Sequence, residues 1–250
     1  MFGLVTARTL WRIFWGTLFC RNHGIILPAQ AIKCYSPELI VHPSLDTDID
    51  ESMFWVNKAH SLVIGPGLGR SANEFAIMNL ARSNNSPLVV DADGLYVVSQ
   101  NLETVRNYKL TILTPNVNEF NLLCLEAEPS DDPQETAKLA RQLEGVTIVR
   151  KGLSDIISDG DQLIIYNFEG SPRRCGGQGD LLSGAAAVFS FWFANTKIDS
   201  PYSSTMLAAT AACMLTRRCA KRAFEKYGRC TMTNKMIEEI GPAFDELFIA

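Results

Sequence analysis

The stretch RRCGGQGD at residues 173–180, followed by LLSGAAAVF at 181–189, decides the fold of this chain. Its closely spaced glycines let backbone N–H groups approach a ligand, because no Cβ stands in the way. The apolar run of small residues after them is typical of a buried helix. Those N–H groups and the positive end of the helix dipole would then face the same point. The stretch therefore predicts an anion site at a helix N-terminus.

Asp180 stands at the mouth of this predicted anion site. A carboxylate is out of place in a simple phosphate cradle. It does fit a general base that takes a proton from a hydroxyl group as that hydroxyl attacks a phosphoryl group. The alternative is a glycine-rich turn in which Asp180 only caps the helix.

Composition places the chain among globular proteins with a large core. It has 250 residues, of which 47% are hydrophobic and 20% charged, and this suits one α/β domain. The net charge is −4, and the acidic residues all follow residue 37, which argues against nucleic acid as a partner. Seven cysteines without close pairs indicate free thiols in a reducing compartment rather than disulfides or a zinc site.

Residues 1–30 differ from the rest of the chain and are treated as an atypical leader. The apolar run 10–20 contains Arg12 and is too short to span a bilayer. An arginine-bearing segment without acids resembles a mitochondrial presequence. A signal peptide and an unrelated opening joined to a domain at 31–250 are the alternatives, and the location is predicted as mitochondrial or cytoplasmic.

Short β-branched runs alternate with helical patterns along residues 31–250. This order predicts a three-layer α/β fold, with a mostly parallel sheet covered by helices on both faces. The expected strands are 61–64, 87–90, 110–113 and 146–149, with a hairpin over 155–168 that turns at 159–161. The expected helices are 71–82, 117–125, 133–143, 179–194, 203–227 and 233–247.

Unusual glycine or polar clusters follow four of the expected strands. They occupy residues 65–70, 91–94, 114–119 and 150–155. Ligands of open α/β sheets bind outside the carboxyl ends of the strands. The four clusters are therefore expected to meet at one crevice.

The first two clusters have structural alternatives. GPGLG at 65–69 lacks the glycine spacing of a dinucleotide fingerprint, so it either lets a bulky ligand approach the backbone or forms a tight turn. DADG at 91–94 is explained by turn chemistry, since Asp caps and glycine tolerates the left-handed region.

The other two clusters carry candidate ligand groups. In TPNVNE at 114–119, the Asn side chains suit a carboxamide or sugar, and Glu119 suits hydrated Mg²⁺ unless it only complements the helix dipole. Lys151 could reach a nucleotide phosphate as a point charge, or it is simply solvated. Cys175 is taken as structural.

Together these motifs resemble the ATP-dependent NAD(P)H-hydrate dehydratases of the ribokinase-like superfamily, in their eukaryotic form. The resemblance runs from about Ala31 to Ala250 and is most specific over 170–180, where the sequence is GSPRRCGGQGD. It implies a repair enzyme that dehydrates C6-hydrated NADH or NADPH while cleaving ATP, with Mg²⁺ as cofactor. No nucleic acid or membrane partner is expected, and a homo-oligomer is one expected assembly.

The resemblance also implies site residues. Asp180 would be catalytic and would face the substrate hydroxyl. The hydrated dinucleotide would contact Gly67, Asn116, Val117, Asn118, Glu119, Phe120, Asn121, Leu122 and Asp180. ATP would contact Lys151, Gly152, Leu153, Ser154, Asp155, Gly170, Ser171, Pro172, Arg173, Arg174, Cys175, Gly176, Gly177, Gln178 and Gly179.

The chain departs from the family pattern in two places. Residues 1–30 do not match the family's opening strand and glycine-containing loop, so N-terminal strands are expected to be missing. Leu153 stands where a polar residue is commoner, so its nucleotide contact would use the backbone. Two alternative functions follow: a small-molecule alcohol kinase of the same fold, and a truncated, inactive nucleotide-binding form.

Overall fold

The structure is a computed structural model, and it describes residues 17–19, 32, 34, 40–42, 48–69, 73–124 and 130–249. Most of the expected leader, Arg70 and residues 35–39 lie outside the described residues. Within the described residues, no helix combines the length and apolar character that crossing a bilayer requires.

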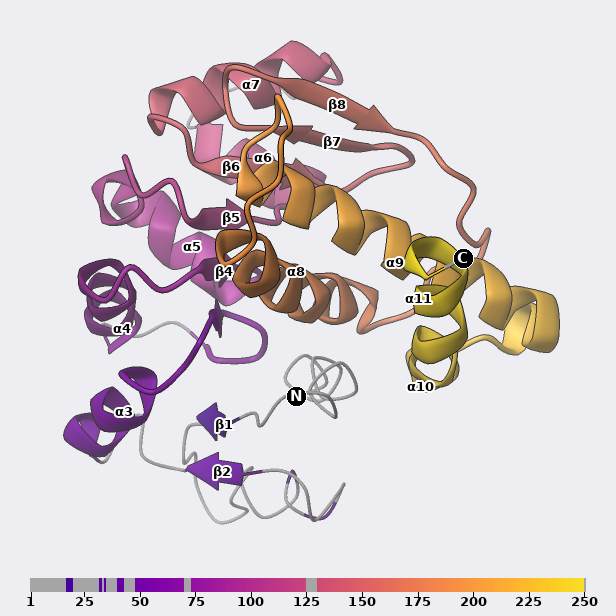
Figure 1. Ribbon diagram of the computed structural model, residues 1–250, viewed down its shortest axis with the longest axis horizontal. Coiled ribbons are helices and arrows are strands. Elements are labelled where there is room, and N and C mark those ends of the chain that lie inside the picture. The colour runs from indigo at the N-terminus through magenta and orange to yellow at the C-terminus, as the bar shows by residue number, and fades with distance from the viewer. Residues whose placement is uncertain are drawn as a thin grey trace.

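A six-stranded sheet organises the molecule, in the order β3-β4-β5-β6-β7-β8 (Figure 1). The first four strands are parallel, and β7 and β8 form an antiparallel hairpin at one edge, as the sequence predicts. The strands are Leu62–Ile64, Leu88–Val90, Thr111–Leu113, Thr147–Arg150, Asp155–Ser158 and Leu163–Tyr166. In the described residues, β1 (Thr17–Phe19) and β2 (Ile40–His42) form a separate parallel pair.

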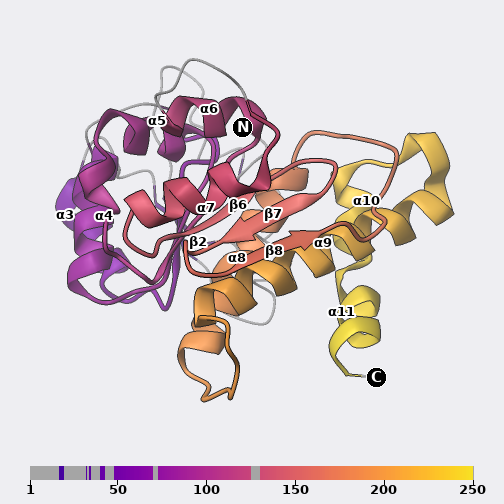
Figure 2. The same cartoon turned by 90° about the horizontal axis from the view of Figure 1, so that it is seen from above.

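Helices cover both faces of this sheet, which gives the predicted three layers (Figure 2). On one face, α8 (Gln178–Ala194) packs on β3 and β4, and α9 (Ser204–Tyr227) packs on β5 to β7. The other face carries α3 (Ile49–Val56), α4 (Asn73–Ser83), α5 (Asp93–Gln100), α6 (Val117–Cys124) and α7 (Pro133–Gln142).

Alternation along the strands builds the two cores. Val89 belongs to the core beneath α8 and α9, whereas its neighbours Leu88 and Val90 belong to the core on the opposite face. Successive side chains of a strand point to opposite faces, so a fully apolar strand must be covered twice. The continuous hydrophobic runs in the sequence follow from this double burial.

The predicted helix over 233–247 is wrong as a single element. It divides into α10 (Thr233–Glu238) and α11 (Ile240–Phe248), with a break at Glu239. Pro242 lacks the N–H that a continuous helix would pair with a carbonyl one turn earlier, and proline is tolerated only in a helix's first turn. Gly241 weakens the same region further.

Among the described residues, two helices were not expected from the sequence. α3 was not predicted, and α5 starts inside the cluster that was interpreted as a turn. Gly94 lies in the first turn of α5 because a Cβ there would approach Ile64 O within 2.7 Å. A glycine that allows close helix–strand packing resembles a turn glycine when only the sequence is known.

Candidate functional site

The ends of four parallel strands meet at one edge of the sheet, as the sequence predicts. Lys151, directly after β6, places its Nζ 2.7 Å from Asp91 Oδ1, which follows β4. The same Nζ lies 3.7 Å from Glu119 Oε2 in the first turn of α6, which follows β5. The Lys151 N–H donates to Pro115 O at 2.8 Å, and this bond joins the ends of β5 and β6.

The N-terminus of α8 closes the same point from the other side. A Cβ added at Gly179 would lie 3.4 Å from Lys151 Nζ and 3.6 Å from Asp91 Oδ2. The absence of a side chain at Gly179 therefore lets the helix N-terminus approach the lysine and its carboxylate. Asp180, the next residue, is half-buried in the first turn of α8.

The loop over 65–69 is shaped mainly by the protein's own backbone. Gly65 has a φ of 126°, and a Cβ there would lie 1.7 Å from Asp91 O, so only glycine fits. The Gly69 N–H donates to Asp93 Oδ2 at 2.8 Å. Of the two sequence interpretations, the tight turn accounts for Gly65. Gly67 is exposed and stays a candidate for ligand contact.

The cluster over 116–122 divides into an exposed face and a buried one. Asn116 and Glu119 cap α6 reciprocally: the Asn116 N–H donates to Glu119 Oε2 at 2.7 Å, and the Glu119 N–H donates to Asn116 Oδ1 at 3.0 Å. Asn116, Val117, Asn118 and Leu122 are exposed, and Asn121 is half-buried.

Phe120 does not share this exposed face. It is 2% exposed and belongs to the core beneath α6, with the Arg150 guanidinium 4.6 Å from its ring centroid. Helical spacing turns the Phe120 side chain toward the sheet, and the implied substrate contact of this residue stays a prediction.

Residues 151–155 form a tight loop between β6 and β7. Leu153 is 94% exposed, and its backbone contact with a nucleotide stays a prediction. The Gly152 N–H donates to Asp155 Oδ1 at 3.3 Å, and Ser154 is half-buried. The carboxylate of Asp155 therefore holds the loop rather than standing free for a nucleotide.

Residues 170–177 form the connection from the β7–β8 hairpin to α8. Pro172, Arg173, Arg174 and Gly176 are exposed, and Gly170, Ser171, Cys175 and Gly177 are half-buried. Gly177 is the N-cap of α8 in the left-handed conformation, with a φ of 88°. The Gln178 Nε2 donates to Arg173 O at 3.2 Å and folds the connection back on itself.

Comparison with known proteins identifies the family of this chain. The family model for NAD(P)H-hydrate dehydratase matches residues 25–243. The chain belongs to the NAD(P)H-hydrate dehydratase family. The ATP-dependent (S)-NAD(P)H-hydrate dehydratase of Mus musculus is 44% identical over 244 residues, which cover 92% of this chain and 70% of that protein. The enzyme of the same name from Ixodes scapularis is 45% identical over 234 residues, covering 88% and 76% respectively.

Solved structures confirm the fold of this dehydratase family member. A ribokinase-like superfamily protein from Enterococcus faecalis superposes with a TM-score of 0.73 at 21% identity, over 98% of this chain and 82% of the other. The ADP/ATP-dependent NAD(P)H-hydrate dehydratase of Bacillus subtilis, co-crystallised with ATP and Mg²⁺, gives 0.67 at 18% identity, over 98% and 86%. The ribokinase-like expectation is therefore confirmed.

Sequence reasoning missed Asp91 as a site residue of this family member. The turn interpretation of residues 91–94 is incomplete, because the Asp91 side chain is 3% exposed and bonds to Lys151. Ala92 beside it has a φ of 49°, a region that costs an alanine about 1–3 kcal/mol. The bonds of the flanking residues, Asp91 to Lys151 and Asp93 to Gly69, hold that backbone in place.

Arg217 of α9 was also missed. Its Nε donates to Asp155 Oδ2 at 2.6 Å, and its terminal nitrogens reach Gly152 O at 3.1 Å and Phe168 O at 3.4 Å. Burial lowers the pKa of Arg217, but the hydrogen bond to Asp155, the charge of Asp155 and the neighbouring Cys213 and Tyr166 together raise it overall. Arg217 thus binds the first segment implied to hold ATP and packs beside Gly170, where the second begins. No local pattern marks an arginine in a long helix for that role.

Proposed function

We propose that this chain uses Asp180 as the general base in ATP-dependent dehydration of hydrated NADH and NADPH, the reaction named for its family relatives. One observation carries the assignment. Asp180 directly follows Gly179, which lies against Lys151 and Asp91 at the edge where four strands end. Asp180 is therefore adjacent in the chain to the point where the ends of these strands meet.

The chemistry requires a better leaving group than hydroxide. Asp180 accepts the proton of the substrate hydroxyl as that oxygen attacks the γ-phosphorus of ATP, and the bond from this phosphorus to the ADP oxygen breaks. The phosphorylated oxygen then leaves as phosphate, expelled by the ring nitrogen lone pair, and a double bond forms between that nitrogen and C6. Loss of a proton from C5 to the released phosphate or to water then forms the C5=C6 double bond and restores the reduced nicotinamide.

The ATP side is assigned to residues 151–155 and 170–179. Backbone N–H groups over 176–179 lie at the positive end of α8, which favours the charge developing on the phosphoryl oxygens. Lys151 supplies a cation at the same point. Arg217 binds Asp155 and Gly152 of the first segment and lies beside Gly170 at the start of the second, which supports a single nucleotide site.

The hydrated dinucleotide is assigned to the exposed face that adjoins Asp180. Gly67 and the exposed residues Asn116, Val117, Asn118 and Leu122 line that side, and Glu119 and Asn121 lie next to them. The amide side chains suit a carboxamide or ribose. Homo-oligomer assembly and the mitochondrial or cytoplasmic location stay predictions.

The residues present fit Mg²⁺. Asp91 and Glu119 both face Lys151, so two carboxylates share one ammonium group and retain excess negative charge. Carboxylate oxygens are ligands that Mg²⁺ accepts, usually together with several waters. Mg²⁺ would neutralise charge on the triphosphate. Glu119, at the more exposed side of the pair, would hold it through water.

A product assay tests the proposal. The full chain is incubated with hydrated NADPH, ATP and Mg²⁺, and the absorbance of reduced nicotinamide is followed beside release of ADP and phosphate. We expect absorbance to return with equal amounts of ADP and phosphate. A stable phosphoester without recovered absorbance would instead identify an alcohol kinase. Thermal stabilisation by ATP without any product would identify an inactive nucleotide-binding form.

A further inference from the structure

Thr233, the first residue of α10, lies against Gly176 and Gly177, which precede α8 and are called the glycine loop below. Its side-chain hydroxyl donates to Gly176 O, and Cys175 Sγ is 3.4 Å from the same hydroxyl oxygen. A Cβ added at Gly177 would lie 3.2 Å from both Thr233 Oγ1 and Cγ2. Thr233 is 7% exposed, so this is an enclosed contact between residues 57 positions apart.

The contact sets the direction of one peptide group. In a planar trans peptide, the carbonyl of one residue and the N–H of the next point in opposite directions. When Thr233 holds the Gly176 carbonyl, the Gly177 N–H must point away from α10. Gly176 is exposed, and a Cβ added there would meet no atom within 4 Å.

Without such a tether, the peptide between Gly176 and Gly177 could turn over. Glycine allows both signs of φ at little cost, so two successive glycines offer many alternative orientations. A reversed peptide would present a carbonyl oxygen, rather than an N–H, to an approaching phosphate. The tether therefore selects the orientation that attracts an anion.

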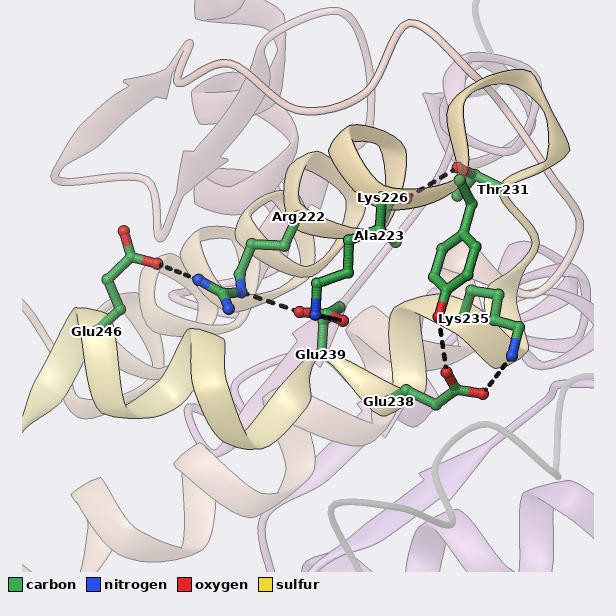
Figure 3. A network of polar contacts seen from close by, with 9 residues as sticks. Arg222, Ala223, Lys226, Thr231, Lys235, Glu238, Glu239 and Glu246 are labelled. Atoms are coloured by element: carbon green, nitrogen blue, oxygen red, sulfur yellow. Dashed lines mark hydrogen bonds and ion pairs between the residues drawn. The ribbon is translucent and has the colours of Figure 1, made fainter.

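The support behind Thr233 is itself anchored. Figure 3 shows that Glu239, at the end of α10, is bound by Arg222 and Lys226 of α9, with distances of 3.0 and 2.6 Å. Met236 of α10 is fully buried and lies 3.5 Å from the Gln178 Nε2. α10 is thus held to α9 on one side and touches the start of α8 on the other.

We infer that Thr233 is a positioning residue for nucleotide binding, because its hydroxyl orients the Gly176–Gly177 peptide toward the phosphates. The inference rests on the proposed function only in assigning this loop to ATP. Thr233 itself contacts neither the hydrated dinucleotide nor Asp180 in this assignment. Its loss should therefore affect ATP affinity much more than the chemical step.

Titration of the full chain with a non-hydrolysable ATP analogue and Mg²⁺, by calorimetry, tests this inference. Thr233→Val removes the hydroxyl at nearly constant volume and should weaken the analogue's Kd by about 5- to 10-fold, the effect of one lost hydrogen bond. The KM for ATP should rise in parallel with little change in kcat. Thr233→Ser keeps the hydroxyl and should bind within about 2-fold of the wild type.

Thr231→Val is the matched control. Thr231 is also buried, and its hydroxyl donates to Gly228 O at 2.7 Å, but it does not touch the glycine loop. This variant should lower the melting temperature and leave the Kd unchanged. Equal weakening in Thr231→Val and Thr233→Val would overturn the inference, because general loosening of the C-terminal helices would then explain both.

A second variant tests the inference if Thr233→Val does not fold. Gly177→Ala disturbs the same contact from the side of the glycine loop, because the added Cβ presses on Thr233. Wild-type affinity in that variant would refute the inference. A wild-type chain that binds no analogue at all would instead refute the assignment of the loop to ATP, and the proposed function would fall with it.

Discussion

The described residues contain two charged clusters in which the central group has opposite charge. In the site cluster, Lys151 lies between the carboxylates of Asp91 and Glu119. In the C-terminal cluster, the carboxylate of Glu239 lies between Arg222 and Lys226 (Figure 3). Each has one buried or half-buried group facing two partners of opposite charge, yet their surroundings differ.

The C-terminal cluster has three basic groups and two carboxylates. Arg222 also donates to Glu246 Oε2 at 3.1 Å, and Arg218 lies 3.0 Å from Glu246 Oε1, so one positive charge is in excess. These residues come from α9, from the break between α10 and α11, and from α11. The cluster ties consecutive helices together, which is a stabilising role.

The site cluster is left with excess negative charge, and its members come from the ends of three different strands. The backbone around it includes Ala92 at a φ of 49° and Gly65 at a φ of 126°. Strained backbone persists where surrounding bonds hold it, and it concentrates at functional sites. The comparison teaches that a similar ion cluster serves stability in one place and ligand binding in the other.

We expect the largest effect from Asp180→Asn, which should lower turnover without lowering stability. Asp180→Asn keeps the shape of the side chain but cannot accept the hydroxyl proton, so kcat should fall by about 10²–10⁴-fold. The melting temperature and the Kd for the ATP analogue should stay near their wild-type values. Steady-state turnover of hydrated NADPH measures the change. Retention of more than about a tenth of kcat would contradict the general-base role.

The next prediction tests whether Lys151 contributes both to ATP binding and to the stability of the protein. Lys151→Met should weaken ATP binding by about 10- to 100-fold, and it should destabilise the protein by about 3 kcal/mol because Asp91 is left buried without its cation. Adding Asp91→Asn removes that stranded charge. The double variant should regain most of the stability in urea unfolding but none of the ATP affinity. Recovery of both would mean that Lys151 is only structural.

We expect a smaller effect, on stability alone, from a change in the C-terminal cluster. Glu239→Gln replaces two charge-assisted hydrogen bonds with weaker ones and should lower the free energy of unfolding by about 1–2 kcal/mol at neutral pH. Turnover should change little, since α10 retains its packing. Urea denaturation measures the stability and the product assay the turnover. A loss of activity without a loss of stability would reverse the comparison.

We also expect the difference in stability between the wild type and Glu239→Gln to depend on pH. Burial raises the pKa of Glu239, but hydrogen bonds from Lys226 and Arg222 outweigh it and lower the pKa below its usual range. A lowered folded-state pKa contributes stability above the unfolded value of about 4.3, and this is lost as pH falls through the folded-state pKa. The stability gap between wild type and Glu239→Gln should therefore be constant near neutral pH and shrink in acid. A gap that grows in acid would contradict the assignment.

The smallest effect comes from a neighbouring surface pair. Lys235 lies 2.7 Å from Glu238 at an exposed position of α10. Exposed ion pairs contribute little because water screens them. Lys235→Ala should leave the urea midpoint and turnover unchanged. A clear loss in either would show that α10 is more sensitive to its surface charges than the buried Glu239 network implies.

Local patterns were enough to predict much of the fold. Apolar runs such as 62–64 and 88–90 predicted the strands, and the polar clusters after them predicted one shared edge. The small-residue run after Asp180 predicted α8 and its approach to the site. These signals are local because strand burial and helix N-termini depend on nearest neighbours in the chain.

Local patterns in the sequence did not predict other features of the structure. The break at Glu239 depends on whether Gly241 and Pro242 interrupt a helix or lie in the first turn of a new one. α5 was hidden because its first residues, Asp93 and Gly94, also form good turns. Phe120 was implied as a substrate contact, yet it is buried in the core.

By itself, the amino-acid sequence determined the layered α/β architecture, the family and the position of Asp180 at the start of a helix, because periodicity and glycine spacing are properties of short segments. Only the tertiary structure decided the partners of Asp91, Arg217 and Thr233. Those contacts join residues 60, 62 and 57 positions apart. Bonds across such separations form only when strand order and helix packing bring the segments together, and no local pattern encodes them.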